Sequence, residues 1–205
     1  VNVDFKNSET AFISIGTGVS VNDMSVTAGT YTFTGNTTAT LEVAGKLTVG
    51  SGATANIKTA VEVGSIEVAG TLDISQSIKV KNGTVTLGSA DASLTAASLT
   101  TDSGDLTIAA VSQDVLEALN YKASQGAITI LTLTEGGFMG NLTQEEIVVP
   151  TRAAAPVEKY FTELLWNADK TQLSYAARVN PDYVGARVEA TTQNGLAGVA
   201  LLQQA

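Results

Sequence analysis

Apolar and polar residues alternate in short runs along most of the chain, and glycines introduce many of these runs. In residues 64–75, GSIEVAGTLDIS, one phrase occurs twice: a glycine, any residue, an apolar residue, any residue and an apolar residue. Alternation with a period of two is typical of a β-strand with one buried face. The inward set would be Ile66, Val68, Leu72 and Ile74, and the outward set would include Glu67 and Asp73. The phrase is either a glycine-rich ligand loop or the corner and side of a repeat.

The same phrase recurs at intervals of roughly twenty residues, which favours a repeat. It begins at Gly29, Gly45, Gly64, Gly83, Gly104 and Gly126. Further alternating pairs align between these glycines. One column is Ala53/Ala55, Leu72/Ile74 and Ala92/Leu94, and another is Val61/Val63, Ile78/Val80 and Ala97/Leu99. Each unit therefore contains three short strands separated by Gly, Ser, Asn or Asp.

Three strands of this length with almost no connecting residues cannot form separate hairpins, but they can form one coil of a solenoid. Each strand then pairs in parallel with its equivalent one coil away, and the apolar residues stack inside. The predicted fold is all-β: a right-handed parallel β-helix with three sides and about twenty residues per coil. Glycine suits the corners because it adopts backbone conformations that other residues resist. The predicted corner glycines are Gly45, Gly64, Gly83 and Gly104.

The pattern changes after residue 110. Residues 112–122, SQDVLEALNYK, have Ser112 as an N-cap and Val115, Leu116 and Leu119 on one face, which predicts a short helix or an elaborated loop. Residues 135–141 read as a turn. Residues 160–166 and 172–179 then predict a β-hairpin that closes the last coil. Its aromatic residues are the predicted structural cap: Tyr160, Phe161, Trp166 and Tyr175.

Three regions follow from these patterns. Residues 1–110 would form β-helix coils, and residues 111–179 would form the last coils and the capping region. Residues 180–205, with Pro181 and a run of small and apolar residues, would form a linker with a short helix.

The composition argues against several kinds of ligand and site. The chain has 205 residues, a net charge of −9 and no basic cluster, which argues against binding to nucleic acid. It contains neither cysteine nor histidine, so disulfides, Ser-His-Asp triads and the usual zinc sites are excluded. No apolar run is long enough for a membrane-spanning helix. The outward carboxylates do not converge in the predicted coils, so we expect no enzymatic activity, no metal and no cofactor; these are Glu62, Glu67, Asp73, Asp91, Asp102 and Asp105.

Several stretches resemble the autotransporter-associated β-strand repeats of bacterial type V secretion passengers. These are residues 25–36 (SVTAGTYTFTGN), 40–57 (TLEVAGKLTVGSGATANI) and 64–74 (GSIEVAGTLDI), within a region that covers about residues 12–110. Residues 164–179 resemble the last strands of such passengers, and residues 191–205 resemble the linker helix that lies inside the outer-membrane β-barrel. The resemblance implies a cell-surface, exported chain that ends next to its own barrel.

On this basis the expected function is that of a structural stem of a secreted, cell-surface passenger. Adhesion to a host glycan or surface protein, and a C-terminal segment that aids folding during export, are implied by the resemblance. Two alternatives stay open. One is an extracellular β-helix protein that binds or cleaves polysaccharides, or a phage-type fibre. The other is a partner-binding module with the aromatic hairpin as its interface.

Overall fold

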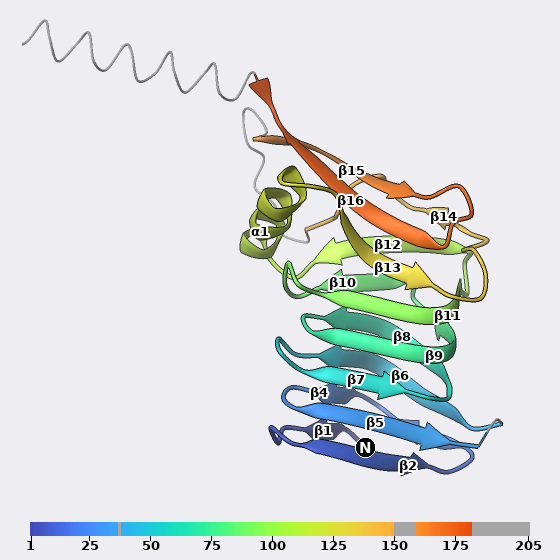
Figure 1. Ribbon diagram of the computed structural model, residues 1–205. Coiled ribbons are helices and arrows are strands. Elements are labelled where there is room, and N and C mark those ends of the chain that lie inside the picture. The colour runs from blue at the N-terminus through green and yellow to red at the C-terminus, as the bar shows by residue number, and fades with distance from the viewer. Residues whose placement is uncertain (37, 150–158, 182–205) are drawn as a thin grey trace, which may run out of the picture.

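A computed structural model describes residues 1–36, 38–149 and 159–181, and these residues form a stack of parallel β-coils that is closed at one end. The chain winds upward in Figure 1, where the strands nearest the viewer run from left to right, so the coil is right-handed. The predicted all-β solenoid is confirmed, with parallel pairing between successive coils. The linker helix was predicted within residues 180–205, and residues 182–205 lie outside the part of the chain that the structure describes.

The strands form three sides. Side A contains β1 (Val3–Phe5), β4 (Met24–Val26), the second half of β6 (Thr40–Val49), the second half of β8 (Ala60–Val68), β10 (Thr84–Leu87), β12 (Asp105–Ala110) and β14 (Asn141–Leu142). Side B contains β2 (Thr10–Ile15), β5 (Thr30–Gly35), β7 (Thr54–Ile57), the first half of β9 (Thr71–Val80), the first half of β11 (Ser93–Thr101) and β13 (Ile128–Leu133). Side C contains β3 (Val19–Val21) and the remaining halves of β6, β8, β9 and β11.

The core is built from the inward positions of these strands. Ile66, Val68 and Leu72 have no exposed surface, and Ile74 is 1% exposed, so the predicted inward set is confirmed. Equivalent residues lie above one another in ladders; on side C, for example, Val19, Leu41, Val61, Ile78 and Leu99 are successive partners. Each coil therefore covers the apolar surface of the coil below it, which is the main source of stability in a solenoid.

The predicted columns are wrong by two residues at several places. Leu72 pairs with Ala55 and Leu94, and Ile74 pairs with Ile57 and Ala96, so Ala53 and Ala92 do not belong to that column. Likewise, Leu99 and not Ala97 pairs with Ile78. The physical reason is that coil length varies at the corners, and a slip of two residues leaves every side chain on the same face. Gly29 and Gly126 precede strands of side B, not of side A.

The corner glycines serve different purposes. Gly64 lies inside β8, and a Cβ there would lie 2.4 Å from the Gly45 carbonyl oxygen and 2.6 Å from that of Ala44. This close stacking of coils excludes a side chain. Gly83 instead has a φ of 62°, which other residues rarely adopt, and its carbonyl accepts from Thr107 N. Gly45 lies inside β6 next to a shift in register, and Gly104 has a φ of 81°.

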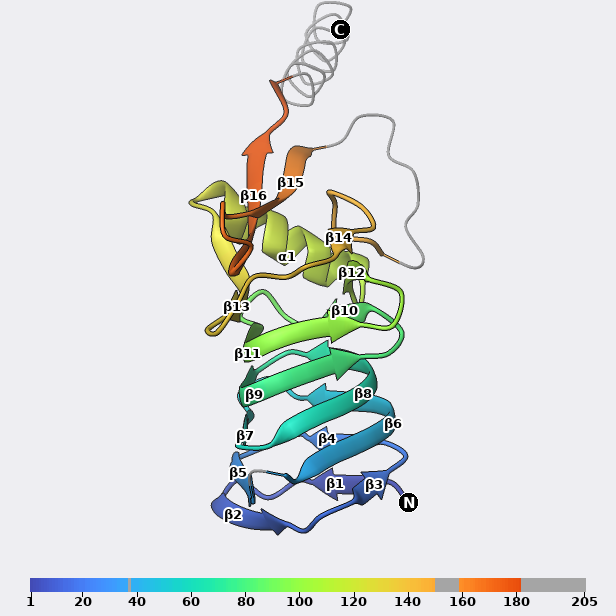
Figure 2. The same cartoon turned by 90° about the vertical axis from the view of Figure 1, so that its right-hand side faces the viewer.

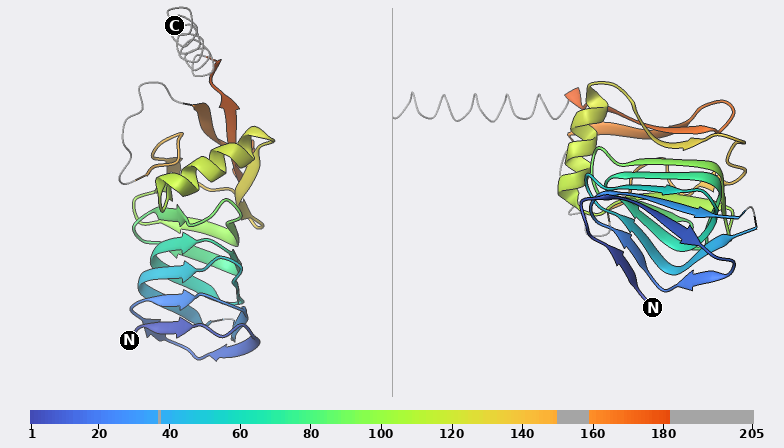
Figure 3. Two further views of the ribbon diagram at one scale, coloured as in Figure 1. Left: turned by 90° about the vertical axis from the view of Figure 1, so that its left-hand side faces the viewer. Right: turned by 60° about the horizontal axis from the view of Figure 1, so that its bottom comes forward.

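In the last coil, helix α1 (Gln113–Ser124) replaces the short turn between sides A and B. Next, β13 pairs in parallel with β11 below it, but its other edge pairs antiparallel with β16 (Gln172–Val179). β16 in turn pairs antiparallel with β15 (Tyr160–Trp166), which confirms the predicted hairpin and its bounds. Figure 2 shows this hairpin standing above the coils, and Figure 3 shows α1 lying beside it.

Candidate functional site

The end of the stack is the most distinctive part of the molecule, and we refer to α1 together with the β15–β16 hairpin as the cap. Ser112 is the N-cap of helix α1, and its hydroxyl accepts from Val115 N at 3.3 Å. Satisfying this otherwise unpaired amide favours a helix start at Ser112. Leu116, Leu119 and Ala123 form the buried face of the helix. The helix therefore seals the corner between sides A and B.

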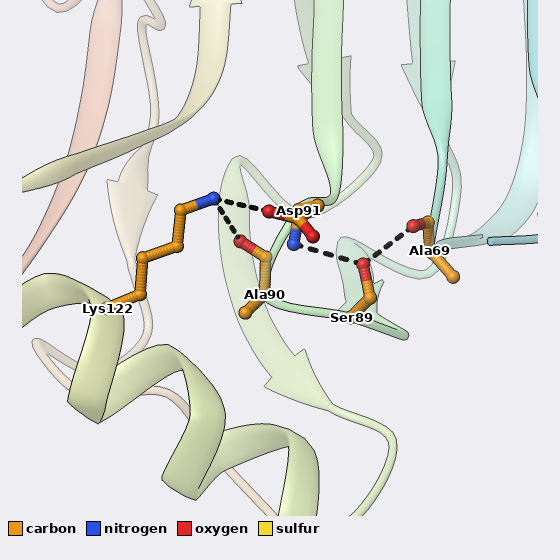
Figure 4. Close-up of polar contacts among 5 residues, drawn as sticks. All are labelled: Ala69, Ser89, Ala90, Asp91 and Lys122. Carbon is orange, nitrogen blue, oxygen red and sulfur yellow. Dashed lines mark hydrogen bonds and ion pairs between the residues drawn. The ribbon is translucent and has the colours of Figure 1, made fainter. Parts of the chain in front are cut away.

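A polar contact fixes the C-terminal end of α1 to the coil below. Lys122 Nζ lies 2.6 Å from Asp91 Oδ1 and 3.0 Å from the carbonyl oxygen of Ala90 (Figure 4). The same turn is tied to the next coil, because Ser89 Oγ accepts from Asp91 N and donates to the Ala69 carbonyl at 2.6 Å. Three successive layers are thus connected through one corner.

The hairpin makes two aromatic contacts with the rest of the molecule. Tyr175 has no exposed surface, and its hydroxyl donates to Asn120 Oδ1 of α1 at 2.5 Å. Trp166 stacks on Phe138, with ring centroids 5.6 Å apart. A hydrogen bond from a buried tyrosine hydroxyl adds to the stability that the buried ring area provides, and so does the stacking of two aromatic rings. The hairpin is therefore anchored to both α1 and the last coil.

The four aromatic residues singled out in the sequence divide into two pairs. Trp166 and Tyr175 face the core, whereas Tyr160 is half-buried beside Lys159, and Phe161 is 44% exposed beneath the Arg178 guanidinium. Sequence reasoning missed Phe138 and Asn120, the partners of the inward pair. Phe138 is 2% exposed although it lies in the glycine-rich stretch 135–141, which reads as a turn. The isolated aromatic residue between glycines was the available signal.

Two adjoining cavities lie between residues 145–147 and the β15–β16 hairpin, and we call them together the cap seam. Their volumes are about 320 and 360 Å³. Both are lined by Glu146, Phe161 and Thr162. The first is also lined by Glu145, Glu163 and residues 176–178 of β16, and the second is also lined by Leu116, Asn120, Ile147, Tyr160 and Tyr175.

Along the coils, most of the predicted outward carboxylates are paired with lysines of other coils. The pairs are Lys46–Glu67 (2.6 Å), Lys58–Asp73 (3.9 Å), Lys79–Asp102 (2.7 Å) and Lys81 with Glu42 (3.1 Å) and Glu62 (3.4 Å). Glu67 and Asp73 point outward from sides A and B, respectively. Within the described residues, no group of three or more carboxylates is arranged to hold a metal ion.

Some of these ion pairs shift the pKa values of their side chains. The hydrogen bond from Lys81, and then its charge, lowers the pKa of Glu42. The bond to Glu42 is also the main reason that the pKa of Lys81 is raised. On Lys79, a hydrogen bond to Asp102 raises the pKa. The side chains are at least partly exposed to solvent, so each pair links coils with only a modest contribution to stability.

No family model, curated protein or solved structure matches this chain. In the part of the chain that the structure describes, no helix is long and apolar enough to span a membrane.

Proposed function

We propose that the chain is a structural stem from a secreted, cell-surface autotransporter passenger, and that its cap assists folding during export. The observation that carries this proposal is the asymmetry of the solenoid. On side B the parallel coils continue one ladder from β2 to β13, and β13 then pairs with an antiparallel hairpin that is bonded to a helix. Such an arrangement suits an elongated spacer with one finished end.

The cap supports the folding role because it provides a surface on which the last parallel coil can form. Parallel coils gain most of their stability from neighbours, so a solenoid has a costly first coil. The hairpin is local in sequence and anchored by Tyr175 and Trp166. Once formed, it presents the edge of β16 to β13, after which each further coil adds to the one before it.

The proposed location can be tested on intact cells that carry the native gene. Antibodies raised against the 205-residue chain should label unbroken cells, and added protease should remove the signal. An internal cytosolic protein of the same cells serves as the control and should be labelled only after lysis. Labelling of our chain only after lysis would contradict the exported-stem proposal. Release of sugars from acidic polysaccharides by the purified chain would instead favour an enzyme.

A further inference from the structure

We propose that the cap seam binds an extended peptide with basic side chains, which adds as a strand to the outer edge of β15. This proposal goes beyond the stem function and does not depend on it. It rests on the backbone of β15, on the shape of the seam and on the charge of the seam lining.

The first argument concerns the direction of the backbone groups of β15. In an antiparallel pair, alternate residues point both their N–H and C=O groups away from the partner strand. Leu164 is such a residue, because its N–H donates to the Glu145 carbonyl oxygen at 2.8 Å and not to β16. By the same alternation, the N–H and C=O groups of Tyr160 and Thr162 point away from β16 towards the seam. Within residues 1–36, 38–149 and 159–181, the structure gives these groups no backbone partner.

The second argument concerns the shape of the seam. The bond from Leu164 to Glu145 joins β15 to the chain that follows β14, and from there the two segments separate. Glu145 and Glu146 line one cavity with residues 161–163, and Glu146 and Ile147 line the next with residues 160–162. The two segments thus run antiparallel with an open gap between them. An unpaired strand edge beside such a gap is the geometry used when a guest strand joins a sheet.

The third argument concerns the guest's side chains. Among the described residues of the seam lining, Glu145, Glu146 and Glu163 bring three carboxylates and Arg178, over the Phe161 ring, brings one cation; Lys159 lies beside the lining, over the Tyr160 ring. The lining therefore favours a positively charged guest. Deeper in the seam, Leu116 and Ile147 are apolar and buried. A strand that alternates basic and apolar residues would direct one set to the carboxylates and the other inward.

Binding can be measured with the full chain and a labelled octapeptide of alternating lysine and valine with blocked ends. Fluorescence anisotropy should show saturable binding, and an alternating glutamate–valine peptide should not bind. Glu146→Gln and Glu163→Gln should each weaken binding about two- to fivefold, as expected for exposed ion pairs. Glu9→Gln, which removes a carboxylate in the first coils, is the matched control and should leave binding unchanged.

Backbone recognition needs a separate test that leaves the protein intact. N-methylation of alternate amides on one edge of the peptide should abolish binding, and methylation of the other edge should preserve it, because only one edge meets β15. Thr162→Pro should weaken binding about two- to tenfold by removing one donor. Three results would overturn the proposal. Methylation could have the same effect on both edges, the glutamate–valine peptide could bind as well as the lysine–valine peptide, or the Glu146→Gln and Glu163→Gln variants could bind as tightly as wild type. The proposal would also be overturned if the chain bound a neutral polysaccharide in place of the peptide, and if Glu146→Gln and Glu163→Gln weakened that binding.

Discussion

The coil stack and the cap are held together in different ways. In the stack, a residue such as Leu72 contacts equivalent residues in the coils above and below, so the same contact is repeated along the axis. In the cap, each main contact occurs once and joins distant parts of the chain: Tyr175 with Asn120, and Trp166 with Phe138. The stack is therefore stabilised by repetition, and the cap by a few specific partners.

This difference predicts different responses to mutation. A change in a middle coil disturbs two neighbours that are themselves paired on their far sides. A change in the cap removes the layer that covers the last coil, so its effect spreads from the end of the stack. Solenoids are expected to behave in this way because their stability is approximately a sum over units and interfaces.

The largest effect should follow from loss of the buried tyrosine of the cap. Tyr175→Ala should lower the free energy of unfolding by about 3–5 kcal/mol, because it leaves a cavity where a large ring was fully buried. Tyr175→Phe is the matched control; it keeps the ring and removes the hydroxyl that donates to Asn120, so about 0.5–1.5 kcal/mol should be lost. Urea unfolding followed by circular dichroism measures both. Equal losses for the two variants would show that the hydroxyl, not the ring, anchors the hairpin.

Close stacking of coils gives the next largest effect. Gly64→Ala places a Cβ against backbone oxygens of Ala44 and Gly45, which cannot move aside as a flexible side chain could, so a loss of about 1–3 kcal/mol is expected. Gly16→Ala is the control, since a Cβ there meets no atom within 4 Å, and its cost should stay within about 0.5 kcal/mol. A similar cost at both positions would mean that glycine acts through chain entropy and not through stacking.

The start of α1 tests whether the helix is an independent part of the cap. Ser112→Ala should cost about 1 kcal/mol by leaving Val115 N without its capping partner. Ser124→Ala removes a hydroxyl at the other end of α1 and should have little effect. Hydrogen exchange at the first turn of α1 reports the difference. Unchanged exchange after Ser112→Ala would contradict the capping role.

The smallest effect concerns the ion pairs that link coils on side C. The folded pKa of Glu42 is lowered by Lys81, so this pair stabilises the fold above the ordinary pKa range of glutamate, and the contribution is lost as pH falls through the folded pKa. Lys81→Met should therefore make the melting temperature less sensitive to acid. Lys170→Met is the control, because Lys170 binds the Gly140 carbonyl, which does not titrate in this range. Identical pH dependence of wild type and Lys81→Met would rule out the pair as a contributor.

The sequence predicted the stack well because its rule is local. Alternation with a period of two places Ile66 and Val68 inside and Glu67 outside without knowledge of their partners. The exact register could not be obtained in this way: a column aligned through Ala53 in place of Ala55 has the same inward face. Corner lengths set the register, and they vary from coil to coil.

The cap was predicted only in part. The bounds of the hairpin follow from its strand–turn–strand pattern, and the start of α1 follows from Ser112. The partners Asn120 and Phe138 could not be found, because each meets its hairpin residue across a distance in sequence that no periodicity spans. The cap seam was not predicted either, since it arises where β15 separates from residues 145–147.

Native-state hydrogen exchange of wild type and Tyr175→Ala most directly tests the claim that the cap closes an otherwise open stack. The predicted result is a graded loss of protection. It should be greatest in α1, β13 and β16, smaller in β11 and β9, and least in β4 and β5. Leu41→Ala, in a lower coil, should give a loss centred on β6 and its neighbours. A loss confined to the β15–β16 hairpin, or one spread evenly over all coils, would contradict the account.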